Sequence, residues 1–168
     1  MVEFRDARYG DDVTAPLIAE IQADQTHRYG GPDQTPVDPA EFTPPEGFFL
    51  VALVHGEVIG CGGVRRHDPV TAELKRMYVR PAHRRQGLAS QILTELETRS
   101  RAAGYTRIVL ETGEVQPEAV ALYERHGYEP VDGFGHYRCS PLSRSYARAL
   151  SPSTSRDTSA SARATPER

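Results

Sequence analysis

Hydrophobic and polar positions change their period several times along the chain, which predicts a mixed α/β domain. Runs that alternate between apolar and polar residues, or that are apolar throughout, favour strands. Tight turns at His55–Gly56 and Asp132–Gly133 favour hairpins between neighbouring runs. The expected strands are 2–8, 48–54, 57–64, 71–79, 105–111, 128–131 and 135–139, the last two forming a closing hairpin.

Three stretches between these runs repeat their apolar residues at helical spacing. The first ends before Tyr29, the second runs from Gly87 to Gly104, and the third runs from Pro117 to Gly127. Glycine at the end of a helical pattern and proline at its start are the usual boundary signals. The order of elements predicts a central sheet flanked by helices.

The stretch 71–111 reads as a strand, a helix and a second strand, so we expect a βαβ unit there. The apolar phase slips within 71–79, because Leu74 and Met77 fall on opposite parities of the strand. A phase slip in a strand predicts a β-bulge, which bends the strand and leaves backbone groups without partners. We expect such a bulge in the first strand of this unit.

Two segments lack a periodic pattern. Residues 30–47 contain five prolines and three glycines and predict an irregular loop with a short turn at 39–42. A loop of this length is either a binding loop or lid, or a plain connector. Residues 151–168 contain only Ser, Thr, Ala, Pro, Arg, Asp and Glu and predict a disordered tail. We therefore expect one domain over 1–150.

Composition narrows the class of protein. The 168 residues carry a formal net charge of −3 and 38% apolar residues, as expected for one soluble domain without a nucleic-acid partner. No run is long enough to span a membrane, so we expect a cytoplasmic protein. Cys61 and Cys139 have no metal-ligand spacing, so no metal is expected. Reduced, buried or half-buried thiols are favoured over a disulfide.

A basic turn that contains glycine separates the strand 71–79 from the following helix. Free backbone N–H groups and the positive end of a helix make such a turn a site for a phosphate group. The P-loop, dinucleotide, nucleophile-elbow and HExxH patterns are all absent from the sequence. A cluster of basic residues on an acidic chain indicates a small anionic ligand, and this cluster comprises Lys75, Arg76, Arg80, Arg84 and Arg85.

Two motifs resemble those of the GNAT superfamily of N-acetyltransferases. Residues 84–89, RRQGLA, resemble its acetyl-CoA motif (Q/R)-x-x-G-x-(G/A), with Ala89 in place of the commoner second glycine. Its second signature, N-x-x-A-x-x-x-Y-x-x-x-G-[FY], resembles residues 116–128, with Gln116 in place of the usual Asn. The resemblance covers 2–150 and implies a GNAT-like fold, in which helices flank a centrally splayed sheet.

The resemblance also implies where the cofactor binds. Backbone N–H groups of 84–89 would hold the pyrophosphate of acetyl-CoA, and the bulged strand would present its backbone to the pantetheine arm. The N–H of Met77 is the candidate donor to the thioester oxygen. The cofactor-binding residues expected on this basis are Met77, Tyr78, Val79, Arg84, Arg85, Gln86, Gly87, Leu88, Ala89 and Gln116.

Acetyl transfer to an amine needs a neutral nitrogen, and an alkylamine has a pKa of about 10.4, so a general base helps at neutral pH. Glu73 is the first candidate, with an exposed carboxylate at a strand end as the alternative. Glu111 is the second candidate and serves equally well to bind a cationic acceptor. Tyr123 matches the general acid of the family, and packing in the core is its alternative.

The expected function is acetyl-CoA-dependent N-acetylation of a primary amine of a small molecule, by direct attack in a ternary complex. A protein or peptide N-acetyltransferase and a non-catalytic acyl-CoA-binding module stay open. The sequence leaves open the amine, the acyl preference and the choice between monomer and homodimer. Tyr29 and Glu111 are the expected acceptor-binding residues, among aromatic and histidine residues expected near the acceptor: Tyr29, Phe42, Phe48, Phe134, His136 and Tyr137.

Overall fold

The computed structural model describes residues 1–152, so most of the predicted tail, 153–168, lies outside the described residues. Strands and helices follow one another in nearly the predicted order. The elements are β1 (Val2–Ala7), α1 (Ala15–Tyr29), the 3-10 helix η1 (Pro39–Phe42), β2 (Gly47–Val54), β3 (Glu57–Arg66), β4 (Thr71–Val79), the 3-10 helix η2 (Pro81–His83), α2 (Leu88–Ala102), β5 (Arg107–Gly113), α3 (Pro117–Arg125), β6 (Glu129–Val131) and β7 (Ser143–Ala149).

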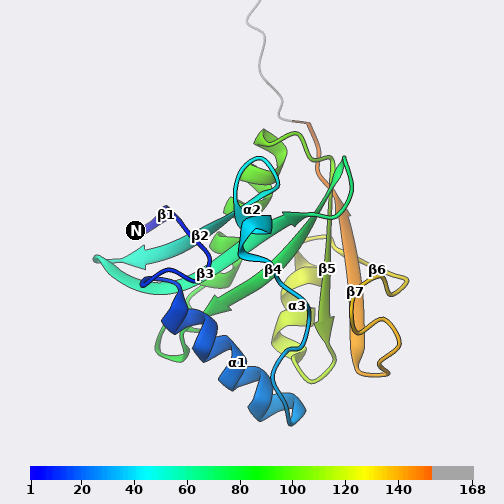
Figure 1. Ribbon diagram of the computed structural model, residues 1–168, viewed down its shortest axis with the longest axis horizontal. Helices are drawn as coiled ribbons and strands as arrows, with labels where there is room; N and C mark the ends of the chain where they lie inside the picture. The colour runs from blue at the N-terminus through cyan, green and yellow to red at the C-terminus, as the bar shows by residue number, and fades with distance from the viewer. Residues whose placement is uncertain (153–168) are drawn as a thin grey trace, which may run out of the picture.

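The strands form one sheet in the order β1-β2-β3-β4-β5-β7-β6 (Figure 1). Every neighbouring pair is antiparallel except β4 and β5, which are parallel and are connected through α2. The predicted βαβ unit is therefore confirmed. The fold class, a mixed sheet with flanking helices, is confirmed as well.

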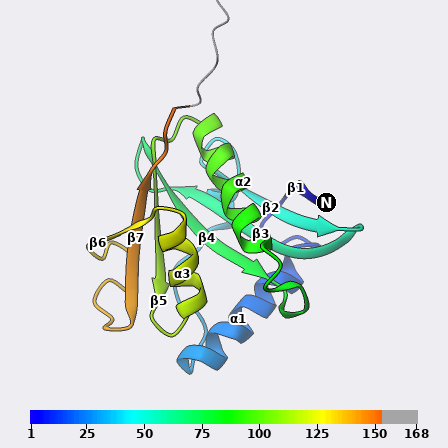
Figure 2. The same ribbon diagram turned by 180° about the vertical axis from the view of Figure 1, so that it is seen from behind.

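Helices cover both faces of the sheet. α1 lies on one face, and α2 and α3 lie on the other (Figures 1 and 2). Leu17 of α1 packs into a cluster with Phe42 and Phe49, whereas Ile92 and Leu96 of α2 belong to a second cluster across the sheet. Burying one such side chain stabilises the fold by about 1.5–3 kcal/mol. Each helix is thus fixed to its own face of the sheet.

β4 and β5 diverge at a point that we call the fork. The two strands pair only as far as Leu74 and Leu110, although β4 continues for five residues beyond Leu74 and β5 for three beyond Leu110. Leu74 and Leu110 belong to the cluster on the α2 face. Because side chains alternate along a strand, the next residues, Lys75 and Glu111, lie on the α1 face. The fork therefore begins with two charged residues of opposite sign.

The predicted bulge lies in β4, directly after the fork begins. Cys61 of β3 is opposite Tyr78, whereas Gly63 is opposite Lys75, so β4 contains one extra residue. The backbone accommodates this extra residue at Arg76, which has a φ of 57°, in the left-handed region that few non-glycine residues adopt. The bulge predicted from the phase slip is therefore confirmed.

Two predictions from the sequence are wrong. Residues 135–139 do not form a strand, and β6 pairs instead with β7 (Ser143–Ala149), which lies between β5 and β6. β7 buries Ser145, Tyr146 and Ala147, and this mixed polarity conceals its strand character in the sequence. Cys139 is exposed rather than buried. Both thiols are free, and burial raises the pKa of Cys61 to about 12.

Candidate functional site

The turn before α2 has a backbone that requires glycine. Gly87 has a φ of 75°, a left-handed conformation that costs a residue with a Cβ about 1–2 kcal/mol. A Cβ at this position would have nothing within 4 Å, so backbone conformation rather than crowding inside the protein selects glycine. Arg85 is also left-handed, with a φ of 62°. The turn is therefore held in one shape by two unusual backbone positions.

This shape leaves a group of backbone donors free. Within residues 1–152, no hydrogen bond uses the N–H groups from Arg85 to Ser90, and the first helical bond of α2 runs from the Gln91 N–H to the Gly87 carbonyl at 3.2 Å. Such N–H groups at the positive end of a 15-residue helix suit an anion. The donor set fits the pyrophosphate predicted to bind here. We call residues 84–90 the donor loop.

The basic residues near this loop do not form the single patch that the sequence predicts. Arg76 forms an ion pair with Asp33 at 2.6 Å, and Arg80 forms one with Glu20 at 2.9 Å. Arg84 donates from Nε to the backbone carbonyl of the last β4 residue at 2.9 Å. These three guanidinium groups are therefore engaged within the protein, whereas the Arg85 side chain is exposed, so the free donors of the loop come from its backbone and from Arg85.

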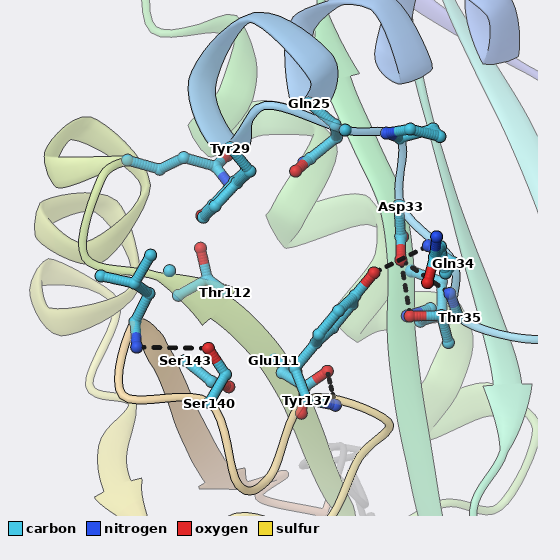
Figure 3. A pocket seen from close by; sticks show the side chains of 16 residues that line it. Gln25, Tyr29, Asp33, Gln34, Thr35, Glu111, Thr112, Tyr137, Ser140 and Ser143 are labelled. Carbon is cyan, nitrogen blue, oxygen red and sulfur yellow. Dashed lines mark hydrogen bonds between the residues drawn. The ribbon is translucent and has the colours of Figure 1, made fainter.

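A cavity of about 340 Å³ lies on the α1 face of the fork (Figure 3). It is enclosed by the C-terminal end of α1, residues 31–35, the start of the fork, residues 111–116 and residues 137–143. Small-molecule sites in proteins commonly measure about 300–1,000 Å³. We call it the acceptor cavity, because it lies where the sequence predicts the acceptor.

The loop predicted at 30–47 forms one wall of this cavity. Asp33 accepts a hydrogen bond from Arg76 and donates its backbone N–H to the Gln22 side chain at 2.8 Å. The backbone N–H of Gln34 donates to the Tyr137 hydroxyl at 2.7 Å, which connects this loop to the segment after β6 (Figure 3). Of the two predicted roles, the loop therefore lines a cavity instead of only connecting elements.

Tyr29 and Gln116 lie together on another wall of the cavity. The Gln116 side-chain amide donates to the Tyr29 hydroxyl at 2.9 Å. Gly113 makes this contact possible, because a Cβ there would lie 1.8 Å from the Tyr29 hydroxyl. Tyr29 thus lines the cavity as expected of an acceptor-binding residue. Gln116, predicted to bind the cofactor, reaches the same cavity.

Glu111 contributes a carboxylate with incomplete hydrogen bonding. Its Oε1 receives only a long hydrogen bond of 3.4 Å from the Tyr137 N–H, and its buried Oε2 has no partner within the described residues. Burial raises the pKa of Glu111, while the positive charge of Lys75 opposes this shift. The side chain lines the cavity (Figure 3). Glu111 can therefore accept a proton or hold an ammonium group there.

Glu73 lies in a different environment. It is only 6% exposed, so its predicted alternative, an exposed carboxylate at a strand end, is wrong. Arg65 donates from Nε to one of its oxygens at 2.9 Å, and the Lys75 ammonium lies 3.9 Å from the other. Glu73 is not part of the cavity wall. Its carboxylate therefore belongs to an internal ion pair.

Tyr123 lies on the α2 face of the sheet. It is 6% exposed and packs against Tyr128 and Tyr146, with ring centroids 5.6 and 6.5 Å away. Its hydroxyl has no hydrogen-bond partner among residues 1–152 and yet is not fully enclosed. Burial raises its pKa, so the phenol keeps its proton at neutral pH. Tyr123 thus combines core packing with a free, protonated hydroxyl.

The remaining predicted residues divide between the two sides of the fork. Met77, Tyr78 and Val79 form the outer half of β4, and the Arg84 guanidinium lies 5.4 Å from the Tyr78 ring centre. In the donor loop, Gln86 is exposed, Ala89 is partly buried and Leu88 is buried. Of the aromatic and histidine residues expected near the acceptor, Tyr29 and Tyr137 line the cavity, as Glu111 does. Phe42 is in the core and Phe134 packs against His67.

Sequence reasoning missed Lys75 and Asp33 as parts of the cavity wall. The sequence did contain a signal for Lys75, because in a strand Lys75 lies on the same face as Glu73 and on the face opposite to Leu74. Charged residues on one face of an otherwise buried strand indicate an internal polar site. No local pattern marks Asp33, whose position depends on the fold of the 30–47 loop.

A metal site and a membrane-spanning helix are both absent from the described chain. Residues 1–152 contain no group of three or more His, Cys, Asp and Glu side chains arranged to hold a metal ion. None of their helices has both the length and the apolar character needed to cross a membrane.

The chain thus forms an α/β domain with a splayed mixed sheet, a turn with free backbone N–H groups before α2 and a charged cavity on the α1 face. The acetyltransferase (GNAT) family matches residues 16–128 of this chain. The chain belongs to that family and is an acyltransferase.

Individual relatives agree with this assignment. The IAA acetyltransferase of Azospirillum brasilense is 33% identical over 133 residues, which cover 79% of this chain and 87% of that protein. A crystal structure named as an acyl-CoA N-acyltransferase, from Klebsiella pneumoniae, has a TM-score of 0.78 and 31% identity over 89% of this chain and 98% of that one. A GNAT acetyltransferase from Elizabethkingia anophelis with acetyl-CoA bound shares the fold, with a TM-score of 0.67 and 16% identity over 89% of this chain and 98% of that one.

Proposed function

We propose that this protein transfers an acetyl group from acetyl-CoA to a primary amine of a small molecule, by direct attack in a ternary complex. The family assignment and the free N–H groups of the donor loop support acetyl-CoA as the donor. The bound donor supplies the acetyl group as an activated thioester. The backbone from Arg85 to Ser90 holds its pyrophosphate, and the bulge after Lys75 offers the Met77 N–H to the thioester oxygen.

The acceptor cavity, whose rim two connected loops border, is the observation that favours a small molecule over a protein. The hydrogen bond from the Gln34 N–H to the Tyr137 hydroxyl connects two loops on its rim. The Arg76–Asp33 ion pair fixes one of these loops to β4. An extended peptide needs an open groove beside the sheet, whereas these contacts join the loops that border a partly open cavity of about 340 Å³.

Glu111 is the residue we propose as general base. It lines the cavity, its Oε2 has no partner among the described residues, and burial raises its pKa toward the range in which a base works best. Glu73, the other candidate, is already bound to Arg65 at 2.9 Å. Glu111 takes the proton of the amine, the nitrogen bonds to the acetyl carbon, and the carbon–sulfur bond breaks.

Tyr123 is the proposed general acid. The leaving thiolate has a cysteine-like pKa of about 8.5, so a proton donor eases its departure. The Tyr123 hydroxyl has no partner in the described part of the chain, and burial raises its pKa, which keeps the proton on the phenol at neutral pH but makes the phenol a weaker acid. The phenol gives its proton to the sulfur and takes one back from solvent, while Glu111 releases to solvent the proton that it took from the amine.

Two measurements test this proposal. Calorimetry is expected to show acetyl-CoA binding, and absence of binding at millimolar cofactor would contradict the proposed donor. A thiol-detection assay is expected to show coenzyme A release with at least one class among amino acids, polyamines and aminoglycosides. Release with peptides or proteins but with none of these amines would instead favour the protein acetyltransferase.

A further inference from the structure

We infer that the acceptor carries a carboxylate as well as its amine, and that Lys75 binds this carboxylate in the acceptor cavity. The inference rests on the proposed function and specifies its substrate class. Three observations support it. The Lys75 ammonium lacks a hydrogen-bond acceptor, the Glu111 carboxylate has an oxygen without a hydrogen-bond partner, and the other charged groups around the cavity are already paired.

Lys75 is the only lysine in the sequence; arginine supplies every other fully cationic side chain. It lines the acceptor cavity, and its side chain is only 9% exposed. The nearest carboxylate oxygen, Glu73 Oε1, is 3.9 Å from Nζ, beyond hydrogen-bond distance. That carboxylate already accepts a hydrogen bond from Arg65 at 2.9 Å. The Lys75 ammonium therefore has no hydrogen-bond acceptor within residues 1–152.

A buried ammonium without acceptors is unfavourable, since it has three N–H donors and a full charge to solvate. Burial lowers the pKa of Lys75, and the negative charge of Glu73 only opposes this shift. An anionic oxygen from the cavity side would supply the missing acceptor and keep the lysine charged. A compact ammonium suits a carboxylate end in a small cavity, whereas a guanidinium is larger and planar.

Glu111 shows the complementary condition in the same cavity. Its Oε2 is buried and has no partner within the described residues. Lys75 and Glu111 directly follow the last paired residues of β4 and β5, so both lie at the start of the fork. A ligand with an ammonium and a carboxylate would give each of them a partner of opposite charge.

The other charged groups around the cavity already have partners. Asp33 is bound to Arg76 at 2.6 Å, and Glu73 is bound to Arg65. Arg65 also bonds to Glu41 at 3.0 Å. The pairing leaves Lys75 and Glu111 as the two charges available to a ligand. An amine without a carboxylate would give Glu111 a partner of opposite charge but would leave the Lys75 ammonium without a hydrogen-bond acceptor.

The wild-type enzyme gives the first test. Straight-chain amino acids with different numbers of methylene groups between nitrogen and carboxylate are compared with their own carboxamides by coenzyme A release. For at least one length, we expect kcat/KM of the acid to exceed that of the amide by about 10- to 100-fold, as for loss of a charged hydrogen bond. Equal values at every length would overturn the inference but leave the proposed function intact. No release with any amine would count against the proposed function itself.

Lys75→Met gives the second test, with Lys75→Arg as the variant that keeps the charge. Lys75→Met is expected to raise KM for the acid about 10- to 100-fold more than KM for the amide, so that the acid-to-amide ratio falls toward one, whatever common change the lost charge causes through Glu111. Lys75→Arg should retain part of the preference. A preference for the acid that persists in a folded Lys75→Met protein would overturn the assignment to Lys75.

A direct binding measurement does not depend on either variant. Because Lys75 is the only lysine, protein grown with lysine labelled with carbon-13 at Cε gives a single lysine Cε signal in an NMR spectrum. With coenzyme A present, the preferred amino acid is expected to shift this signal, and its carboxamide is not. A signal that stays in place at saturating amino acid would overturn the inference.

Discussion

The donor loop and the acceptor cavity, the two sites proposed for the two ligands, are built in different ways. The donor loop offers backbone N–H groups from consecutive residues, Arg85 to Ser90, while the Arg84 Nε is bound to a backbone carbonyl of β4. The acceptor cavity offers side chains from segments far apart in sequence, with Asp33, Lys75, Glu111 and Tyr137 among them. One site is local in sequence and the other depends on the whole fold.

This difference explains which site can vary. A backbone site needs only a fixed conformation, so many side chains are tolerated around the essential Gly87. A side-chain site changes its ligand whenever one of its residues changes. The donor loop can therefore serve one donor across a family, while the cavity selects the acceptor of each member. Substitutions should accordingly change catalysis and acceptor choice in the cavity, and donor affinity in the loop.

The largest effect is expected from Glu111→Gln in the cavity. General-base catalysis contributes about 10²–10⁴-fold, and we expect kcat to fall by about 10³-fold with acetyl-CoA affinity unchanged. Glu111 works as a base only when it is deprotonated, and burial raises its pKa. The activity of the wild type should therefore begin to fall, as the pH is lowered, at a pH above the usual pKa of a glutamate. In the rate–pH profile of Glu111→Gln, this fall in activity at low pH should be absent. Rate–pH profiles and calorimetry measure both quantities.

Glu114→Gln is the matched control for this substitution. Glu114 is an exposed glutamate just after β5, in an ion pair with Arg144, and it does not line the cavity. Its replacement should leave kcat and the pH profile nearly unchanged. If Glu111→Gln kept both as well, the base would have to be sought at Glu73 or in solvent, and catalysis would no longer be a property of the cavity.

A smaller effect is expected from Tyr123→Phe, on the α2 face of the fork. Removing the hydroxyl should lower kcat by about 10²-fold while the acetyl-CoA affinity stays the same, because the ring packing is retained. Tyr146→Phe is the control, since Tyr146 packs beside Tyr123 and its hydroxyl donates to Glu124 instead. Equal turnover of Tyr123→Phe and wild type, with chemistry rate-limiting, would leave Tyr123 only its packing role.

The same contrast decides how much of the molecule the sequence could predict. The donor loop and the bulge in β4 were predictable, since Gly87 and the phase slip between Leu74 and Met77 are local signals. The cavity had no such local signal: the resemblance alone placed Tyr29, Glu111 and Tyr137 near the acceptor, since Glu111 and Tyr137 come together only when β5 and the segment before β7 are in place. β7 itself was missed, because its buried side chains are mostly small or polar.

The smallest effect is expected from Gly87→Ala, which tests the backbone character of the donor loop. The added Cβ meets no atom of the protein, so the strain of the left-handed conformation is the expected intramolecular cost, about 1–2 kcal/mol. If the loop relaxes to relieve this strain, its N–H groups move and acetyl-CoA affinity should fall about tenfold. Calorimetry with acetyl-CoA measures this loss.

Gly104→Ala provides a control near the other end of α2. Gly104 is also left-handed, with a φ of 94°, and a Cβ there also meets nothing within 4 Å. Both variants should therefore lose similar thermal stability, while only Gly87→Ala loses donor affinity. Equal acetyl-CoA affinities of the two variants would mean that the arginine side chains hold the pyrophosphate. The contrast between a backbone site and a side-chain site would then no longer hold.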